Sequence, residues 1–281
     1  MAEQKETVHG GDIYRNPSVT DYSVNSNPLG VPEAVRKSVQ ESADRIMHYP
    51  DVRCDRLRES ISDFERIEKE KILCGNGAAE LFFAAVQAVC PQKALVIAPS
   101  FSEYEEALRS VGAEAEYYYL CEEDNFQIRE DYVDKLSEEI DMIFLCNPNN
   151  PTGQTIDRDM LIKILDRCKK QNIVVILDEC FLEFLDEPNR YEMSNLRGEY
   201  PNLLIIKAFT KIFSMPGLRL GYAISSNPDI LEEMSWKLQQ WNVSVPAQMA
   251  GVAALENPKE YIRQTREYVS GQREYMRNIM K

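Results

Sequence analysis

Short apolar runs alternate with amphipathic segments through the central part of the chain. The runs are apolar on both faces, which is typical of buried parallel strands, and the segments between them have helical spacing. Strands are expected at 72–74, 94–98, 115–120, 142–146, 173–177 and 203–206, and helices at 78–89, 102–112, 129–140 and 157–171. This alternation predicts an α/β fold with a mostly parallel sheet sandwiched by helices.

The flanking regions have a different pattern. Residues 1–30 are irregular and rich in turn formers, and helices are expected at 32–42 and 54–67. After Asn227 the chain becomes helical again, with a break at 241–246 and a long helix from about Pro258 to Lys281. Internal repeats and low-complexity segments are absent from the sequence.

Composition and charge exclude several function classes. The 281 residues carry a net charge of -14, which repels polyanions and makes nucleic acid an unsuitable partner. No apolar stretch approaches the ~18 residues of a membrane span, and the first residues lack an apolar targeting segment. Seven cysteines without CxxC spacing indicate reduced, buried thiols, and therefore a cytoplasmic protein without membrane partners.

Candidate site residues follow the predicted strands at the points where these strands end. They are Gly75-Asn76-Gly77, Phe101, the loop 147–153, Asp178-Glu179 and Lys211. Ligands of parallel sheets bind beyond the carboxyl ends of the strands. The sequence therefore predicts one site at that edge.

Lys211 has the surroundings that a Schiff-base lysine beside a phosphate site requires. Thr210 precedes it and Arg219 lies eight residues on, so an amine that can bond to an aldehyde has a hydroxyl and a guanidinium near it. The Gly75–Gly77 turn before a helix would add amides and the positive end of a helix dipole. Surface lysines after strands are common, so residue chemistry alone leaves the alternative of a solvated lysine open.

The ordered set Asn-Pro-Asn-Asn-Pro-Thr-Gly at 147–153, Asp178-Glu179 and Thr210-Lys211 with Arg219 resembles the fold-type I pyridoxal-phosphate enzymes, the class I/II aminotransferase superfamily. The resemblance covers essentially the whole chain. It implies pyridoxal 5′-phosphate as cofactor, with Lys211 as its Schiff-base partner and proton shuttle and Asp178 as the partner of the pyridine nitrogen.

The same resemblance assigns the remaining cofactor contacts. Asn150 would donate to the phenolic oxygen and Phe101 would lie over the ring face. The phosphate would be held by Thr210, Arg219 and the amides of Gly75, Asn76 and Gly77. In relatives a hydroxyl commonly stands two residues before the Thr-Lys pair, where this chain has Ala208, so one phosphate contact is missing.

Tyr49 in Tyr-Pro-Asp matches a tyrosine that in this family reaches the phosphate of the neighbouring subunit's cofactor, which implies a homodimer. The predicted organisation has an N-terminal arm and part of a small domain at 1–45. A large cofactor-binding α/β domain follows at 46–245. Residues 246–281 form a long helix that leads to a small domain expected to be incomplete at its C-terminus.

Other segments resemble the L-threonine-O-3-phosphate decarboxylases of cobalamin synthesis. They are His9-Gly10-Gly11, the stretch 23–30, Phe-Ser-Glu-Tyr at 101–104, Phe181 and Trp241-Asn242-Val243. Histidinol-phosphate aminotransferases usually have a tyrosine at the position of Phe181. A small phosphorylated amino acid is the implied substrate, with His9 and Asn27 as candidate substrate residues.

Alternatives remain open at this point. Histidinol-phosphate or related aminotransferases use the same lysine, aspartate and asparagine, so spacing does not separate the two reactions. In the family the small domain continues past the long helix and carries a substrate-binding arginine, which this sequence lacks, so a cofactor-binding but inactive form is also considered. A dinucleotide oxidoreductase is disfavoured because Glu80 occupies the third position of the glycine fingerprint. A metal site is not expected, since His9 and His48 are the sole histidines.

Overall fold

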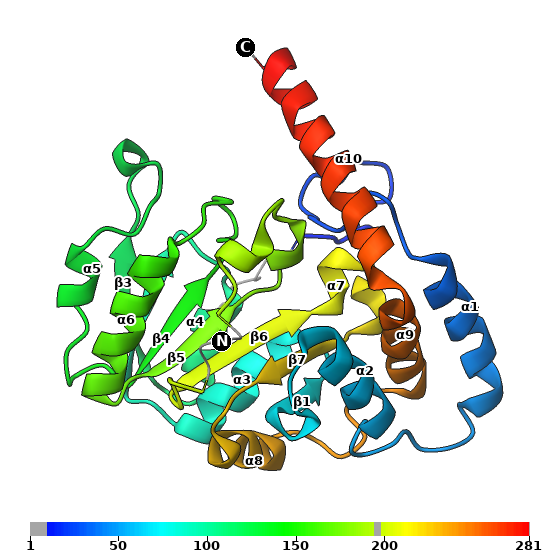
Figure 1. The fold of residues 1–281 in the computed structure, drawn as a ribbon, viewed down its shortest axis with the longest axis horizontal. Helices are drawn as coiled ribbons and strands as arrows, with labels where there is room; N and C mark the ends of the chain where they lie inside the picture. The colour runs from blue at the N-terminus through cyan, green and yellow to red at the C-terminus, as the bar shows by residue number, and fades with distance from the viewer. Residues whose placement is uncertain (1–9, 194–197, 281) are drawn as a thin grey trace, which may run out of the picture.

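The computed structural model describes residues 10–193 and 198–280. A seven-stranded sheet runs through the centre of the molecule with helices on both sides, and α10 (Pro258–Ile279) projects beyond the sheet toward the C-terminus (Figure 1). The predicted α/β fold with a helix-covered sheet is confirmed.

The strands follow the order β1-β7-β6-β5-β4-β2-β3. Their bounds are β1 Ile72–Gly75, β2 Lys93–Ala98, β3 Glu114–Tyr119, β4 Met142–Cys146, β5 Val174–Asp178, β6 Leu203–Ala208 and β7 Gly221–Ile224. Neighbours from β6 to β3 pair in parallel, while β7 is antiparallel to both β1 and β6. The sheet is therefore mostly parallel, as predicted, with β7 the reversed strand.

Side chains of the central strands alternate between two hydrophobic clusters, as the twofold pleat of a strand requires. On β4, Met142, Phe144 and Cys146 belong to the cluster that also contains residues of α3 (Ala78–Val89), α4 (Glu103–Ser110) and α8 (Pro228–Lys237). The intervening Ile143 and Leu145 face the cluster that holds α2 (Asp55–Glu65) and α6 (Arg158–Gln171). Burial on both faces explains why these strands are continuously apolar in sequence.

Further helices lie beside this core. α1 (Glu33–Ser42) packs against α9 (Val245–Glu256), and α10 follows α9 directly. The short α7 (Phe209–Ile212) begins where β6 ends.

The predicted domain limits at 45 and 245 stay a prediction. In the described part of the chain, no helix is both long and apolar enough to cross a membrane, and no group of acidic, His and Cys side chains is arranged to hold a metal.

One predicted helix is wrong. Residues 129–140 form only the short α5 (Asp131–Asp134), followed by successive turns. Tyr132, Leu136 and Ile140 are nevertheless buried, and this burial at every fourth position is typical of a helix. The carbonyl oxygen of Leu136 accepts a hydrogen bond from Arg167 Nε at 2.8 Å, so a side chain of α6 binds it instead of a backbone amide of a continuing helix.

Candidate active site

The carboxyl ends of β4, β5 and β6 lie side by side at one edge of the sheet, as predicted. Cys146, the last residue of β4, pairs with Asp178 at the end of β5, and Asp178 pairs with Ile206 on β6. Because β7 is antiparallel, its first residue, Gly221, pairs with Ala208 at the end of β6, which brings Arg219 to the same edge. The carboxyl ends of the parallel strands thus gather the predicted residues along one rim.

Lys211 lies in α7, just beyond β6, with its side chain partly buried. Its Nζ donates to Asn25 Oδ1 at 2.6 Å and lies 5.6 Å from the centre of the Phe181 ring. Burial lowers the pKa of Lys211, and Arg219 lowers it further, while the negative groups nearby act in the opposite direction. A larger fraction of this amine is therefore unprotonated, and nucleophilic, than of an exposed lysine at the same pH.

Asp178 is a buried carboxylate at the end of β5, 4% exposed. Its Oδ2 accepts from the Tyr104 hydroxyl at 2.6 Å, and its Oδ1 accepts from the Cys180 amide at 2.9 Å. Burial raises the pKa of Asp178, against the opposing effects of these hydrogen bonds and of Lys211. A buried carboxylate of this kind favours a cationic partner such as a protonated ring nitrogen.

Arg219 and Gly77 form the other end of the rim. Gly77 has a φ of +88°, and a Cβ there would lie 2.5 Å from Nη2 of Arg219, so only glycine lets the guanidinium lie against this backbone. Arg219 itself adopts a left-handed φ of 54°, a conformation that costs free energy and is held by the surrounding contacts. Thr210 is buried next to Lys211 in α7.

The amides of the 75–77 turn differ from the prediction. The Asn76 amide donates to Glu80 Oε2 at 2.7 Å, and the Gly77 amide donates to the Gly75 carbonyl at 2.8 Å. Both donors are therefore engaged by protein atoms, the first by the Glu80 side chain and the second by the backbone of the turn itself. By position, the amides of Ala78, Ala79 and Glu80 also have no earlier carbonyl within the helix, and they are the better candidates for an anion.

Asn150 and Phe101 lie on loops after β4 and β2. The loop of Asn150 is fixed by its other asparagines: Asn147 Oδ1 accepts from the Ile156 amide at 2.9 Å, and Asn149 Nδ2 donates to the Pro99 carbonyl at 3.1 Å. The Phe101 ring meets Tyr104 edge-on, with centroids 5.7 Å apart. Contacts of Asn150 and Phe101 with a cofactor stay predictions.

The structure does not test the roles predicted for three further candidate residues. His9 falls outside the described residues. Asn27 is buried, and both hydrogens of its amide nitrogen are donated to protein atoms, so a contact with substrate stays a prediction for it. Tyr49 is 78% exposed and stacks on Trp241 with ring centres 4.5 Å apart, which leaves its role toward a neighbouring subunit a prediction as well.

Sequence reasoning missed two side chains that touch the central pair. Tyr104 binds Asp178 from the first turn of α4, and Asn25 binds Lys211 from the N-terminal arm. Both lie inside segments that were singled out, 101–104 and 23–30, but their partners are 74 and 186 residues away in the chain. No local pattern identifies such contacts.

These groups fit pyridoxal 5′-phosphate chemically. The site offers a partly desolvated amine, a buried carboxylate, and a guanidinium in a glycine cradle beside the start of α3. An aldehyde, a basic ring nitrogen and a phosphate dianion are the complementary groups. The match rests on three separate features of the rim rather than on one residue.

Comparisons with known proteins agree with this geometry. A provisionally named threonine-phosphate decarboxylase of Caldanaerobacter subterraneus subsp. tengcongensis is 38% identical over 275 residues, 98% of this chain and 74% of that protein. The threonine-phosphate decarboxylase of Salmonella typhimurium is 34% identical, over 89% of this chain and 71% of that protein.

Solved structures show the same fold. The histidinol-phosphate aminotransferase of Clostridium acetobutylicum superposes with a TM-score of 0.84 at 32% identity, covering 92% of this chain and 75% of that one. The family model "Aminotransferase class I and II" matches residues 17–281. The chain therefore belongs to the class I and II aminotransferase family, whose enzymes depend on pyridoxal 5′-phosphate.

Proposed function

We propose that this enzyme decarboxylates a small phosphorylated amino acid of the L-threonine phosphate type, as in cobalamin synthesis. The similarity to proteins named threonine-phosphate decarboxylases supports this substrate class. The structural observation that carries the proposal is Phe181: its ring lies 5.6 Å from the Lys211 amine, at a position where a histidinol-phosphate aminotransferase is expected to have a tyrosine hydroxyl.

Bound pyridoxal phosphate supplies an aldehyde that takes up the substrate amine and a ring that accepts the electron pair released at the α-carbon. Asp178 would hold a positive charge at the ring nitrogen, because burial disfavours its carboxylate and a cation beside it would offset that cost. Tyr104 and the Cys180 amide orient that carboxylate through their hydrogen bonds.

Lys211 would move the proton. When the bond from the α-carbon to the carboxylate breaks, carbon dioxide leaves and the α-carbon needs one proton to give an amino-alcohol phosphate. The lowered pKa of the Lys211 amine, caused by burial, makes its ammonium form a better donor than an ordinary lysine. Phe181 keeps that side of the amine apolar.

Binding of the cofactor phosphate is assigned to Arg219, Thr210 and the first amides of α3. Arg219 is suited because a planar guanidinium binds a dianion through two nitrogens. The Gly77 cradle places that guanidinium beside the positive end of the α3 dipole. Asn150 and Phe101 are proposed to contact the phenolic oxygen and the ring face, respectively.

We also propose a homodimer in which Tyr49 completes the partner's site. The segment around it exposes Ile46, Met47, Tyr49 and Val52, an unusual density of large apolar side chains. Met47→Glu should weaken association by placing a charge on that surface, which sedimentation velocity would detect as a monomer. An unchanged sedimentation coefficient would argue against this interface.

The seven cysteines are unpaired, and five of them are buried. Free thiols in this number suit a reducing compartment. On this ground we propose a cytoplasmic location, which fractionation of cells that express the protein would test.

The function is tested by offering both substrate sets to the cofactor-loaded enzyme. L-threonine phosphate should release one carbon dioxide per amino-alcohol phosphate formed. Histidinol phosphate with 2-oxoglutarate should give no glutamate. The reverse result would favour the aminotransferase, for which the 0.84 TM-score to a histidinol-phosphate aminotransferase is the supporting observation. Cofactor binding without product from either set would indicate an inactive form.

A further inference from the structure

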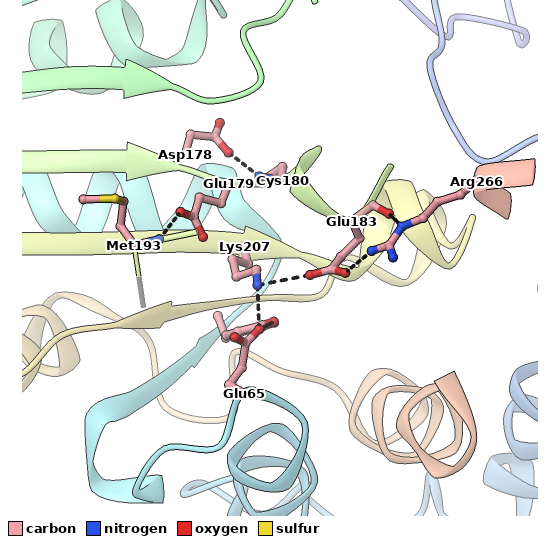
Figure 2. Close-up of polar contacts among 9 residues, drawn as sticks. Glu65, Asp178, Glu179, Cys180, Glu183, Met193, Lys207 and Arg266 are labelled. Carbon is pink, nitrogen blue, oxygen red and sulfur yellow. Dashed lines mark hydrogen bonds and ion pairs between the residues drawn. The ribbon is translucent and has the colours of Figure 1, made fainter. Parts of the chain in front are cut away.

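Helix α10 reaches the Lys211 segment through two adjacent residues. Neighbouring residues of a helix point about 100° apart, so Thr265 and Arg266 can contact different elements. Arg266 Nε donates to the Glu183 carbonyl at 2.8 Å, and its Nη2 lies 3.1 Å from Glu183 Oε2 (Figure 2). Arg266 thus binds both the backbone and the carboxylate of Glu183.

Glu183 also binds a residue of β6. Its other carboxylate oxygen, Oε1, lies 3.4 Å from Lys207 Nζ, which also binds Glu65 Oε1 at 2.8 Å (Figure 2). Lys207 is 4% exposed and lies on β6, four residues before Lys211. Glu183 is also two residues after Phe181, whose ring lies against the Lys211 amine. The Arg266 contact therefore leads to the strand that precedes Lys211 and to the loop whose Phe181 ring lies against its amine.

Thr265 reaches Lys211 from the other side. Its Oγ1 accepts from Asn27 Nδ2 at 2.7 Å, and the same amide nitrogen donates to the Ile212 carbonyl at 2.7 Å. The backbone amide of Asn27 donates to the Lys211 carbonyl at 3.1 Å. Thr265 and Asn27 are both buried, so these bonds form away from competing water.

We infer that Thr265 and Arg266 are positioning residues for Lys211. Through Asn27 they fix the backbone of α7, and through Glu183 they fix Lys207 and the loop that carries Phe181. The placement of α10 therefore determines how the Lys211 amine is presented. This inference rests on the proposed function only in taking Lys211 as the amine that reacts with the cofactor, and it holds for either substrate.

Charge balance makes Arg266 the more informative of the two. Lys207 and Arg266 face Glu65 and Glu183, two cations against two carboxylates, with Glu179 close by. Loss of Arg266 leaves one carboxylate uncompensated in a largely desolvated cluster, and removing one partner of a buried ion pair is costly. An added negative charge in this part of the protein acts toward a higher pKa of the Lys211 amine. Looser packing of α7 acts in the same direction, because it admits water and reduces the desolvation that lowers this pKa.

The experiment measures the reactivity of Lys211 in the cofactor-free protein. The rate of acetylation of Lys211 by acetic anhydride is followed by peptide mass spectrometry across pH 6–10, together with the rate of pyridoxal phosphate capture from its absorbance. Arg266→Gln should move the Lys211 profile to higher pH and slow both reactions about threefold or more near pH 8. Groups facing Lys211 directly, namely Asp178, Cys180 and Arg219, stay unchanged in this variant.

Arg273→Gln is the matched control. Arg273 lies seven residues on, on the same face of α10, and pairs with Asp186 at 3.4 Å, but both side chains are about half exposed. This variant should leave the Lys211 profile as in the wild type. Arg266→Lys, which keeps the charge but loses the two-pronged contact, should fall between wild type and Arg266→Gln and serves if Arg266→Gln does not fold.

A second arm tests the route through Glu183. In a Glu183→Gln background, Arg266→Gln should add little further shift, because the two residues act in series. Fully additive shifts, or a folded Arg266→Gln protein with an unchanged Lys211 profile, would overturn the inference. A shifted acetylation profile without any cofactor capture would contradict the proposed function while supporting the positioning role.

Discussion

At the scale of single residues, the neighbouring acids Asp178 and Glu179 lie on opposite sides of the sheet end. Asp178 binds the Tyr104 hydroxyl, whereas Glu179 lies near Lys207. Figure 2 shows the two carboxylates on opposite sides of the strand end. Alternation along a strand separates them. Their positions after a strand were predictable from sequence, but the long-range partners that distinguish them were not.

Glu179 should make the stability of the fold depend on pH. Burial raises the pKa of Glu179 to about 8, opposed by Lys207 and reinforced by Glu65. Between about pH 4.5 and pH 8 the folded protein keeps a proton that the unfolded chain releases, so stability falls as pH rises, by up to about 1.4 kcal/mol per pH unit. Glu179→Gln should flatten this dependence and raise the melting temperature at pH 8.

Thermal melts at pH 5, 6.5 and 8 check this expectation. Glu138→Gln, which replaces an exposed acid, is the control and should follow the wild-type curve. A Glu179→Gln protein that loses stability with pH as steeply as the wild type would show that Glu179 does not titrate in this window.

Gly77 should be irreplaceable for cofactor binding. In Gly77→Ala the new methyl group would collide with the Arg219 guanidinium and strain a backbone φ of +88°. Displacing that guanidinium should weaken pyridoxal phosphate binding about tenfold or more, equivalent to about 1.4 kcal/mol. Titration of the cofactor-free protein by absorbance gives the dissociation constant.

Gly112→Ala separates the two causes. Gly112 has a similar φ of +74°, but no atom lies within 4 Å of the position that a methyl group would take, so this variant carries the backbone strain without the collision. It should lose stability but keep its cofactor affinity. Equal affinities for the Gly77 and Gly112 variants would mean that the Arg219 cradle does not bind phosphate.

At the scale of elements, the central strands β2, β4, β5 and β6 were predictable because burial on both faces makes each of them a continuous apolar run. The reversed strand β7 was not among the predicted strands. The helix predicted at 129–140 was wrong, because apolar residues at every fourth position occur in successive turns as well as in a helix. The decisive contact, Arg167 with the Leu136 carbonyl, joins residues 31 apart. The local pattern of 129–140 therefore did not determine its element type, because the partner of the Leu136 carbonyl lies outside the segment.

The packing of β7 against the start of α3 should tolerate no side chain at Gly221. A Cβ there would lie 2.8 Å from the Ala78 amide nitrogen and 3.0 Å from the Lys207 carbonyl oxygen, both backbone atoms. Gly221→Ala should cost about 1–3 kcal/mol of unfolding free energy by urea denaturation. Gly217→Ala, with no atom within 4 Å, should cost far less; equal losses would contradict this account of the contact.

At the scale of the whole molecule, the parallel topology places candidate functional side chains from distant parts of the chain along one edge of the sheet. Lys211, Asp178 and Arg219 were predictable because each follows or precedes a strand in a recognisable order. Asn25, Tyr104 and the Arg266–Glu183 contact were not, because an arm, a helix and α10 arrive there only through tertiary packing. The sheet positions Lys211, Asp178 and Arg219 along one edge, and the contacts from these other segments orient the residues at that edge.

The central claim is that the Lys211 amine bonds to the cofactor aldehyde. Borohydride reduction of the cofactor-loaded protein, followed by digestion and tandem mass spectrometry, measures this directly. One reduced pyridoxal phosphate per chain should be found on Lys211, and Lys211→Ala should abolish both the label and the visible absorbance. A label on Lys207 or on a surface lysine, or full labelling of the Lys211→Ala protein, would contradict the account.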